Sequence, residues 1–102
     1  MTRALCADVL TVGLGPDRTL ALDAVGDTEV GVWEMPPGTE QDTEADEVFV
    51  VLAGRGTVTF DDGEVVELRP GVAVRLRGGE RTTWTVTETL RKVYVAVTPA
   101  AR

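Results

Sequence analysis

The chain has 102 residues, of which 43% are hydrophobic and 26% charged, and its formal net charge is −7. This length and composition predict one folded domain covering residues 1–102 rather than a disordered segment. The acidic balance argues against a nucleic-acid partner and an anionic membrane surface, because both need Lys and Arg. There is no run of 18 apolar residues and no unbroken signal-peptide core, so we expect a cytoplasmic protein.

Strand-like runs separated by turn signals follow one another along the chain. The N-terminal segment 4–14, ALCADVLTVGL, is apolar enough to form a strand. Residues 47–53, EVFVVLA, are apolar on both faces, as in a central strand. The two runs that follow flank an Asp-Gly pair at 62–63, which is a strong signal for a tight hairpin. No window shows helical periodicity, so the sequence predicts an all-β fold with little or no helix.

The last two predicted strands alternate clearly between two faces. In RTTWTVTE the side chains of Thr82, Trp84 and Val86 share one face. In RKVYVAV the side chains of Lys92 and Tyr94 lie opposite those of the three valines, because successive residues of a strand point to opposite sides. Alternation alone leaves open whether Lys92 and Tyr94 line the interior or the surface.

The middle of the chain carries a family resemblance. The run EVFVVLAGRGTVTFDDGEVVELRPGVAVRLRGGERTTWTV is similar to the centre of a cupin domain. The flanks GVWEMPPG and ETLRKVYVAV resemble those of the (S)-ureidoglycine aminohydrolase-like cupins, and the resemblance covers residues 29–97. It implies a double-stranded β-helix, also called a jelly-roll barrel. Residues 1–18 would then be a strand outside the matched barrel, and a homodimer that pairs such edge strands is expected.

The metal motifs that the resemblance implies are largely missing. In the first motif Glu47 and Gly54 match. The two histidine positions fall on Gln41 and Thr43, or on Glu40 and Asp42. In the second motif Arg77, Thr82 and Val86 replace the expected Pro, His and Asn. A transition metal in such a site relies on imidazole donors, and the chain has no histidine. We therefore expect no metal and no other cofactor.

The acidic run 40–47 leaves one alternative open. Its five acidic residues are Glu40, Asp42, Glu44, Asp46 and Glu47. Their oxygens could bind a divalent cation such as Mg²⁺, Ca²⁺ or Mn²⁺. A run of this kind is more often a solvated loop that leads into a strand, and we favour that interpretation.

Strand alternation selects the candidate site residues. If Glu47 points into the barrel, Phe49 and Val51 share its face. The predicted ligand-binding residues are Trp33, Glu34, Phe49, Val51, Thr82 and Trp84. Glu47, Lys92 and Tyr94 are the predicted catalytic residues, since a carboxylate placed between aromatic rings suits general acid–base chemistry. The alternative is that Lys92 or Tyr94 only fixes Glu47 and so closes the barrel, while Lys92 could also pair with Glu34.

Three functions remain open at this point. The first is a metal-free cupin that binds a small organic ligand in its barrel without turnover. The second is an isomerase, epimerase or lyase that uses Glu47 with Lys92 or Tyr94 for proton transfer. The third, which the subfamily resemblance implies, is manganese-dependent release of ammonia from ureidoglycine. A fold does not decide among these functions.

Overall fold

The structure is a computed structural model that describes residues 2–97 and contains seven strands and no helix within that range. The expected all-β fold is therefore confirmed. Accordingly, no helix of residues 2–97 is long and apolar enough to cross a membrane. The strands are β1 (Thr19–Val25), β2 (Thr28–Met35), β3 (Gly38–Thr43), β4 (Glu47–Phe60), β5 (Val65–Leu68), β6 (Ala73–Leu76) and β7 (Arg81–Val97).

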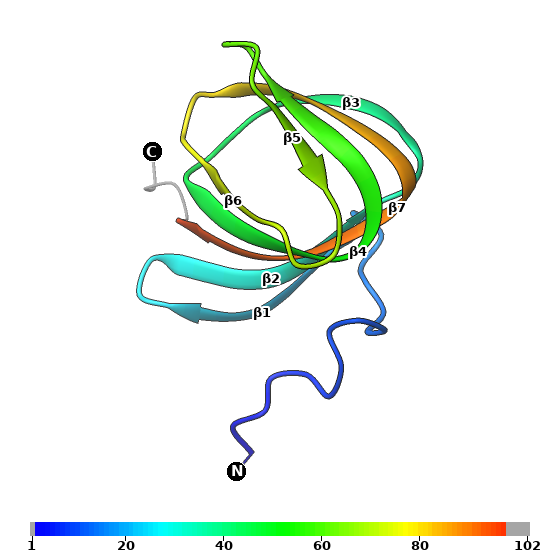
Figure 1. Cartoon of the computed structure of the whole chain (residues 1–102). Coiled ribbons are helices and arrows are strands. Elements are labelled where there is room, and N and C mark those ends of the chain that lie inside the picture. The colour runs from blue at the N-terminus through cyan, green and yellow to red at the C-terminus, as the bar shows by residue number, and fades with distance from the viewer. Residues whose placement is uncertain (1, 98–102) are drawn as a thin grey trace.

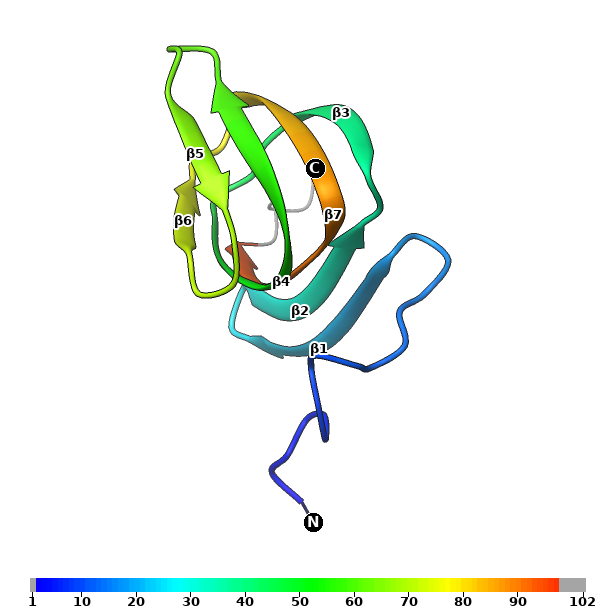
Figure 2. The same ribbon diagram turned by 45° about the vertical axis from the view of Figure 1, so that its right-hand side comes forward.

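The strands form one antiparallel sheet that curves around an interior (Figure 1). Its hydrogen-bonded order is β1-β2-β7-β4-β5, with β3 paired to β7 and β6 paired to β4. Strand β7 is the hub, because it pairs with β2, β3 and β4. In Figure 2, β5 and β6 lie on one side of the interior and β3 with the first half of β7 on the other. This arrangement is the jelly-roll barrel expected from the sequence.

The two longest strands bend together near the middle of β4. Their register shifts between Val51 and Gly56, so each long strand serves two walls of the barrel. Gly54 lies at this bend with φ of 97°. A Cβ at this position would meet the backbone of β7, only 2.7 Å from the Cα of Leu90. Glycine is required here because it tolerates this φ and allows the close approach of the two strands.

The apolar core consists of inward-facing residues of β2, β4, β5, β6 and β7. Leu90, Val58, Leu68, Met35 and Val51 are almost completely buried. Side chains on the opposite faces of the same strands are exposed, and Val95 keeps 43% of its surface accessible. This inside–outside alternation is what a strand with one buried face produces. It also answers the question left open by the sequence, because Lys92 and Tyr94 lie on the buried face of β7.

The N-terminal segment corrects one expectation. Residues 4–14 form no strand, and β1 begins only at Thr19. The Asp8 carboxylate accepts a hydrogen bond from the backbone N–H of Leu10, which makes a local turn in place of an extended strand. The guanidinium of Arg91 donates hydrogen bonds to the carbonyls of Val9 and Val12 and ties the segment to the outside of β7. The expected homodimer stays a prediction.

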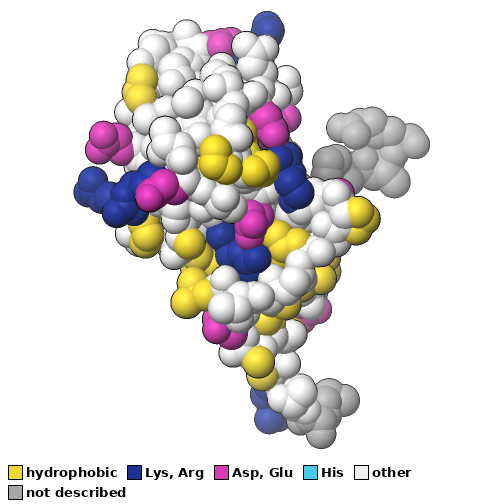
Figure 3. Space-filling model, turned by 90° about the vertical axis from the view of Figure 1, so that its right-hand side faces the viewer, with side chains coloured by type: hydrophobic (Ala, Val, Ile, Leu, Met, Phe, Trp, Pro, Cys, Tyr) yellow, Lys and Arg dark blue, Asp and Glu magenta, His cyan; other side chains and the backbone are white. Residues whose placement is uncertain are grey.

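The molecular surface carries charges of both signs. On the face shown in Figure 3, acidic and basic side chains are interspersed rather than gathered into one patch. Arg75 of β6 pairs with Asp46 at 3.3 Å. The backbone N–H of Gly78 and the Arg75 guanidinium both hold the pKa of Asp46 below its usual range. The pair is exposed to solvent, so its contribution to stability is small.

Candidate functional site

A cavity of about 210 Å³ lies among residues of β1, β2, β3, β4 and β7. We call it the barrel cavity. Eight residues from five strands and the β3–β4 connection line it, and they are Thr19, Trp33, Asp42, Glu44, Glu47, Trp84, Lys92 and Tyr94. Five of these eight residues belong to the predicted site, which the structure therefore brings together. The three that the sequence did not place there are Thr19, Asp42 and Glu44.

The buried Lys92 and the partly buried Glu47 form an ion pair in the barrel cavity. The Lys92 Nζ donates a hydrogen bond to the Glu47 Oε2 at 2.7 Å, and Lys92 is only 6% exposed. The same ammonium lies 4.4 Å from the ring centroid of Phe49, 4.7 Å from that of Trp33 and 4.8 Å from that of Trp84. Aromatic faces attract a cation in this geometry. Glu47 and the three rings together hold the ammonium in a cage.

Glu44 is the main residue that the sequence interpretation missed. It belongs to the acidic run, yet it is only 9% exposed. The interpretation of the run as a solvated loop is wrong at this position, and also at Glu40 and Asp42, which lie on β3. Its Oε2 accepts hydrogen bonds from the Thr82 hydroxyl at 2.6 Å and the Trp84 indole N–H at 3.0 Å. Burial raises the pKa of the Glu44 carboxyl, although these two donors partly oppose the shift.

The backbone explains why Glu44 is buried. Its N–H donates to the carbonyl of Glu80, and its carbonyl accepts from the N–H of Gly79, both at 2.8 Å. These two bonds fix the β3–β4 connection against the turn that precedes β7. The side chain is thereby directed toward Thr82 and Trp84, on the inward face of β7.

Tyr94 lies in the barrel cavity but does not contact Glu47 by a hydrogen bond. Its hydroxyl donates to the Glu29 Oε2 at 2.7 Å. Burial, followed by the hydrogen bond to Glu29 and the charges of nearby carboxylates, raises the pKa of Tyr94 far above its usual value. Tyr94 is therefore a protonated hydrogen-bond donor, not a base. Gly31 leaves the room it needs, since a Cβ there would overlap the Tyr94 hydroxyl.

Four predicted ligand-binding residues lie elsewhere than on the wall of the barrel cavity. The Glu34 carboxylate pairs with the Arg91 guanidinium at 2.7 Å. Glu34 therefore lies on the other side of β2 from Trp33, as adjacent residues of a strand do. Val51 is part of the apolar core. Phe49 packs beneath the barrel cavity against Trp84 and the Lys92 ammonium. The Thr82 hydroxyl donates a hydrogen bond to the Glu44 carboxylate and so holds that side chain in place.

A half-buried arginine, Arg18, lies over the ring of Trp33. Arg18, in the turn before β1, binds Glu40 of β3 through two hydrogen bonds of 2.9 and 3.0 Å. Its guanidinium carbon lies 5.7 Å from the Trp33 ring centroid. The Arg18 backbone has φ of 65°, an unfavourable region for a residue with a side chain. This ion pair lowers the pKa of Glu40 and raises that of Arg18.

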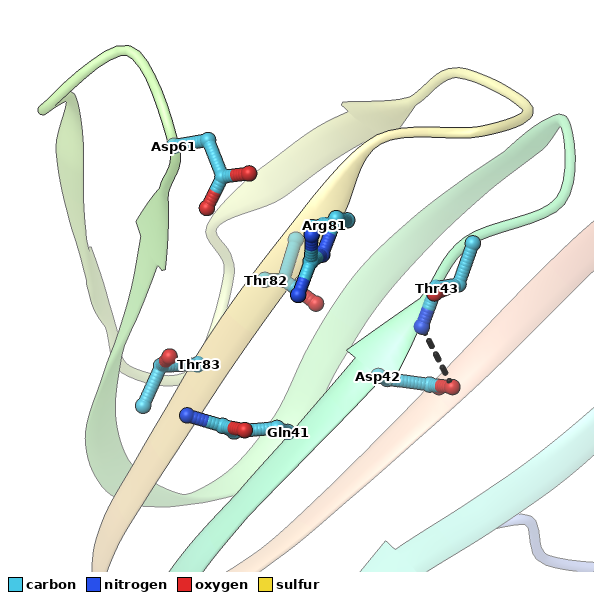
Figure 4. A pocket seen from close by; sticks show the side chains of 7 residues that line it. All are labelled: Gln41, Asp42, Thr43, Asp61, Arg81, Thr82 and Thr83. Carbon is cyan, nitrogen blue, oxygen red and sulfur yellow. Dashed lines mark hydrogen bonds between the residues drawn. The ribbon is translucent and has the colours of Figure 1, made fainter.

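A second hollow, of about 360 Å³, lies on the outside of the barrel (Figure 4). Its seven lining residues are Gln41, Asp42, Thr43, Asp61, Arg81, Thr82 and Thr83. They come from β3, the start of β7 and the turn after β4. Aromatic rings are absent from its lining. The barrel cavity, with its aromatic walls and paired buried charges, is therefore the stronger candidate for a ligand site.

The donors at the barrel cavity do not fit a histidine-type metal centre. Glu47, which matches a ligand position of the cupin motif, is engaged by the ammonium of Lys92. Thr82 stands where the second motif has histidine, and its hydroxyl donates to Glu44. Among residues 2–97, no three His, Cys, Asp or Glu side chains are grouped closely enough to hold a metal ion.

Comparisons with known proteins agree with the fold. A family model for the EutQ-like cupin domain matches residues 22–94. A Rhizobium leguminosarum protein of unknown function is 28% identical with a TM-score of 0.71, over 82% of this chain and 85% of that chain. The Clostridium difficile EutQ protein is 25% identical with a TM-score of 0.63, over 70% of this chain.

These relatives differ in length from the chain. The match spans 56% of the length of the C. difficile EutQ protein. A Thermotoga maritima protein of the DUF861 family is 30% identical with a TM-score of 0.58, over 62% of this chain and 73% of that chain. A comparison with curated proteins gives no match. Because the family model covers most of its residues, the chain belongs to the family of the EutQ-like cupin domain.

Proposed function

We propose that the chain binds a small organic ligand in the barrel cavity and does so without a metal ion. The observation that carries the proposal is the cavity itself, which combines the rings of Trp33 and Trp84 with polar groups of Glu44, Lys92 and Tyr94. Ligand sites typically combine aromatic walls with a few fixed polar groups. The volume of about 210 Å³ is below the 300–1,000 Å³ of typical ligand pockets, so the ligand is small.

A ligand screen by thermal unfolding tests this proposal. A ligand that binds only the native state raises the free energy of unfolding by about 2.7 kcal/mol at 100 times its dissociation constant. The matched variants are Thr19→Phe, which fills the barrel cavity, and Thr39→Phe, which makes the same change at an exposed position of β3. We expect hits whose stabilisation is lost in the first variant and kept in the second. Hits that stabilise both variants equally would contradict binding in the barrel cavity.

An acid–base enzyme is the second candidate. The buried Glu44, whose pKa is raised, and the close pair of Lys92 and Glu47 favour it. Because the Tyr94 hydroxyl already donates its proton to Glu29, its oxygen would orient a substrate by accepting a hydrogen bond, with Glu44 or Glu47 as the proton acceptor. Analysis of each recovered ligand distinguishes the two candidates, because a binding protein returns it unchanged and an enzyme returns a product.

A ureidoglycine aminohydrolase-like activity ranks third. It rests on the resemblance of the flanking segments alone. The manganese ion would need protein ligands other than Glu47, because that carboxylate is paired with Lys92. Release of ammonia from ureidoglycine in the presence of added manganese would make this activity the favoured function of the chain.

A further inference from the structure

The barrel cavity carries more negative than positive charge. Three carboxylates line it, those of Asp42, Glu44 and Glu47, against the single ammonium of Lys92. The contact of 2.7 Å between Lys92 and Glu47 neutralises one carboxylate. Asp42 and Glu44 then remain without a cationic partner inside the barrel cavity. An anionic ligand would be repelled by both groups, and more strongly by Glu44, which is buried, than by Asp42, which is exposed to solvent.

The walls of the barrel cavity already stabilise an alkylammonium group. The Lys92 Nζ lies within 4.8 Å of the ring centroids of Trp33, Trp84 and the adjacent Phe49, and it donates a hydrogen bond to the Glu47 carboxylate. Burying an ammonium is costly unless such partners are present, and a cation on an aromatic face gains stabilisation. Trp33, which is half-buried, and Trp84, which is buried, both line the same cavity. The chemistry that holds Lys92 is therefore available to a second cation.

We propose that the barrel cavity selects a small organic cation, an alkylammonium whose positive charge contacts Asp42 and Glu44 while its carbon chain packs on Trp33 and Trp84. This inference rests on the proposed function and names the class of its ligand. Glu44 has room for the contact, because an ionised carboxylate offers about four acceptor positions and two are used by Thr82 and Trp84.

The two tryptophans provide a direct reporter. They are the only two in the chain, and both line the barrel cavity, so their indole N–H signals in an NMR titration report binding there. The probes are propylammonium, propionate and propionamide, which share a three-carbon skeleton and differ in charge. We expect propylammonium alone to shift the indole signals with saturation, and added salt to weaken its binding.

Two variants localise the charge effect. Asp42→Asn removes a carboxylate that lines the barrel cavity. Asp23→Asn on β1 is the matched control, because both aspartates are exposed and each accepts a hydrogen bond of 2.8 Å from the next backbone N–H. Both variants change the net charge equally. Losing one charge at contact distance should weaken propylammonium binding about fivefold in Asp42→Asn, and Asp23→Asn should bind like the unaltered protein.

Each other outcome overturns the inference. Saturable binding of propionate or propionamide without propylammonium would contradict the cationic class but support the barrel cavity as a ligand site. Equal weakening in both variants would mean that only the overall charge matters. An absence of saturation with propylammonium up to about 100 mM, a hundred times a millimolar dissociation constant, would also overturn it. The proposed function would then be judged separately by the Thr19→Phe screen.

Discussion

Two regions of the barrel interior, the apolar core and the barrel cavity, are built from the same two strands in different ways. In the apolar core Val58 of β4 and Leu90 of β7 are fully buried among other hydrophobic side chains. In the barrel cavity Glu47 of β4 and Lys92 of β7 are buried as an ion pair. Every fully buried side-chain nitrogen and oxygen of residues 2–97 has a hydrogen-bond partner.

The difference teaches what each region contributes. Replacing a buried ion pair with apolar residues of similar volume is often neutral or stabilising, so the paired charges are not needed to hold a barrel together. The apolar core supplies stability through the hydrophobic effect. The polar groups of the barrel cavity add a fixed arrangement of charges and donors, which is what recognition of a ligand requires.

The largest expected effect comes from breaking the ion pair on one side. Lys92→Met leaves the Glu47 carboxylate buried without its partner, which should lower the free energy of unfolding by about 3–5 kcal/mol. Denaturant unfolding measures the change. The double variant Lys92→Met with Glu47→Leu converts this part of the barrel cavity into apolar core, and it should recover most of the loss. A double variant as unstable as the single one would show that the pair stabilises the fold by itself.

A smaller effect is expected from the glycine beside Tyr94. In Gly31→Ala the new Cβ would overlap the Tyr94 hydroxyl and lie 2.7 Å from the carbonyl oxygen of Leu20. Overpacking of this kind costs about 1–3 kcal/mol, and the hydrogen bond from Tyr94 to Glu29 should be lost. Gly13→Ala is the control, since no heavy atom lies within 4 Å of a Cβ at that position. Equal melting temperatures for the two variants would contradict the close packing around Tyr94.

The smallest effect concerns the pH dependence of stability. Because burial raises the pKa of Glu44, the native state binds this proton more tightly than the unfolded chain does. Stability contributed by the protonated form is present below the unfolded pKa and is lost as pH rises through the folded pKa. The Glu44→Gln variant has no proton to lose at this position. As pH rises from about 4.5, its free energy of unfolding should therefore increase relative to that of the unaltered protein.

Urea unfolding between pH 4.5 and 8 tests the sign of this effect. Glu88→Gln, at an exposed position of β7, serves as the control for removing one carboxylate. If Glu44→Gln and Glu88→Gln followed parallel curves, the environment of Glu44 would not differ from that of a surface carboxylate.

Strand alternation made much of the site predictable. That Glu47 shares a face with Phe49, and Thr82 with Trp84, follows from the period of two, which is a property of the extended backbone and needs no tertiary information. That these faces point inward was an expectation from the resemblance to cupins. The same rule shows why Glu34 was a poor choice beside Trp33. Adjacent residues of a strand face opposite sides, so both could not line one cavity.

The rest depended on contacts between segments distant in the sequence. Glu44 lies in an acidic run whose composition indicates solvent, and it is buried because the turn at 79–80 binds its backbone. The partner of Tyr94 is Glu29 rather than Glu47, a choice decided by the pairing of β2 with β7. The apolar segment 4–14 looked like a strand, but an Asp8 turn and the Arg91 contacts hold it in another form.

The pairing of β7 with β2, β3 and β4 has a consequence for how the protein is made. A ribosome synthesises the chain from the N-terminus at about 5–20 residues per second, so β2, β3 and β4 all emerge before Arg81–Val97. Until then β3 lacks the strand it pairs with in the finished sheet. The barrel can close only after the last strand has left the exit tunnel, and such non-local pairing is slow to form. The nascent chain therefore exposes apolar segments during synthesis, and chaperones would bind these segments in that interval.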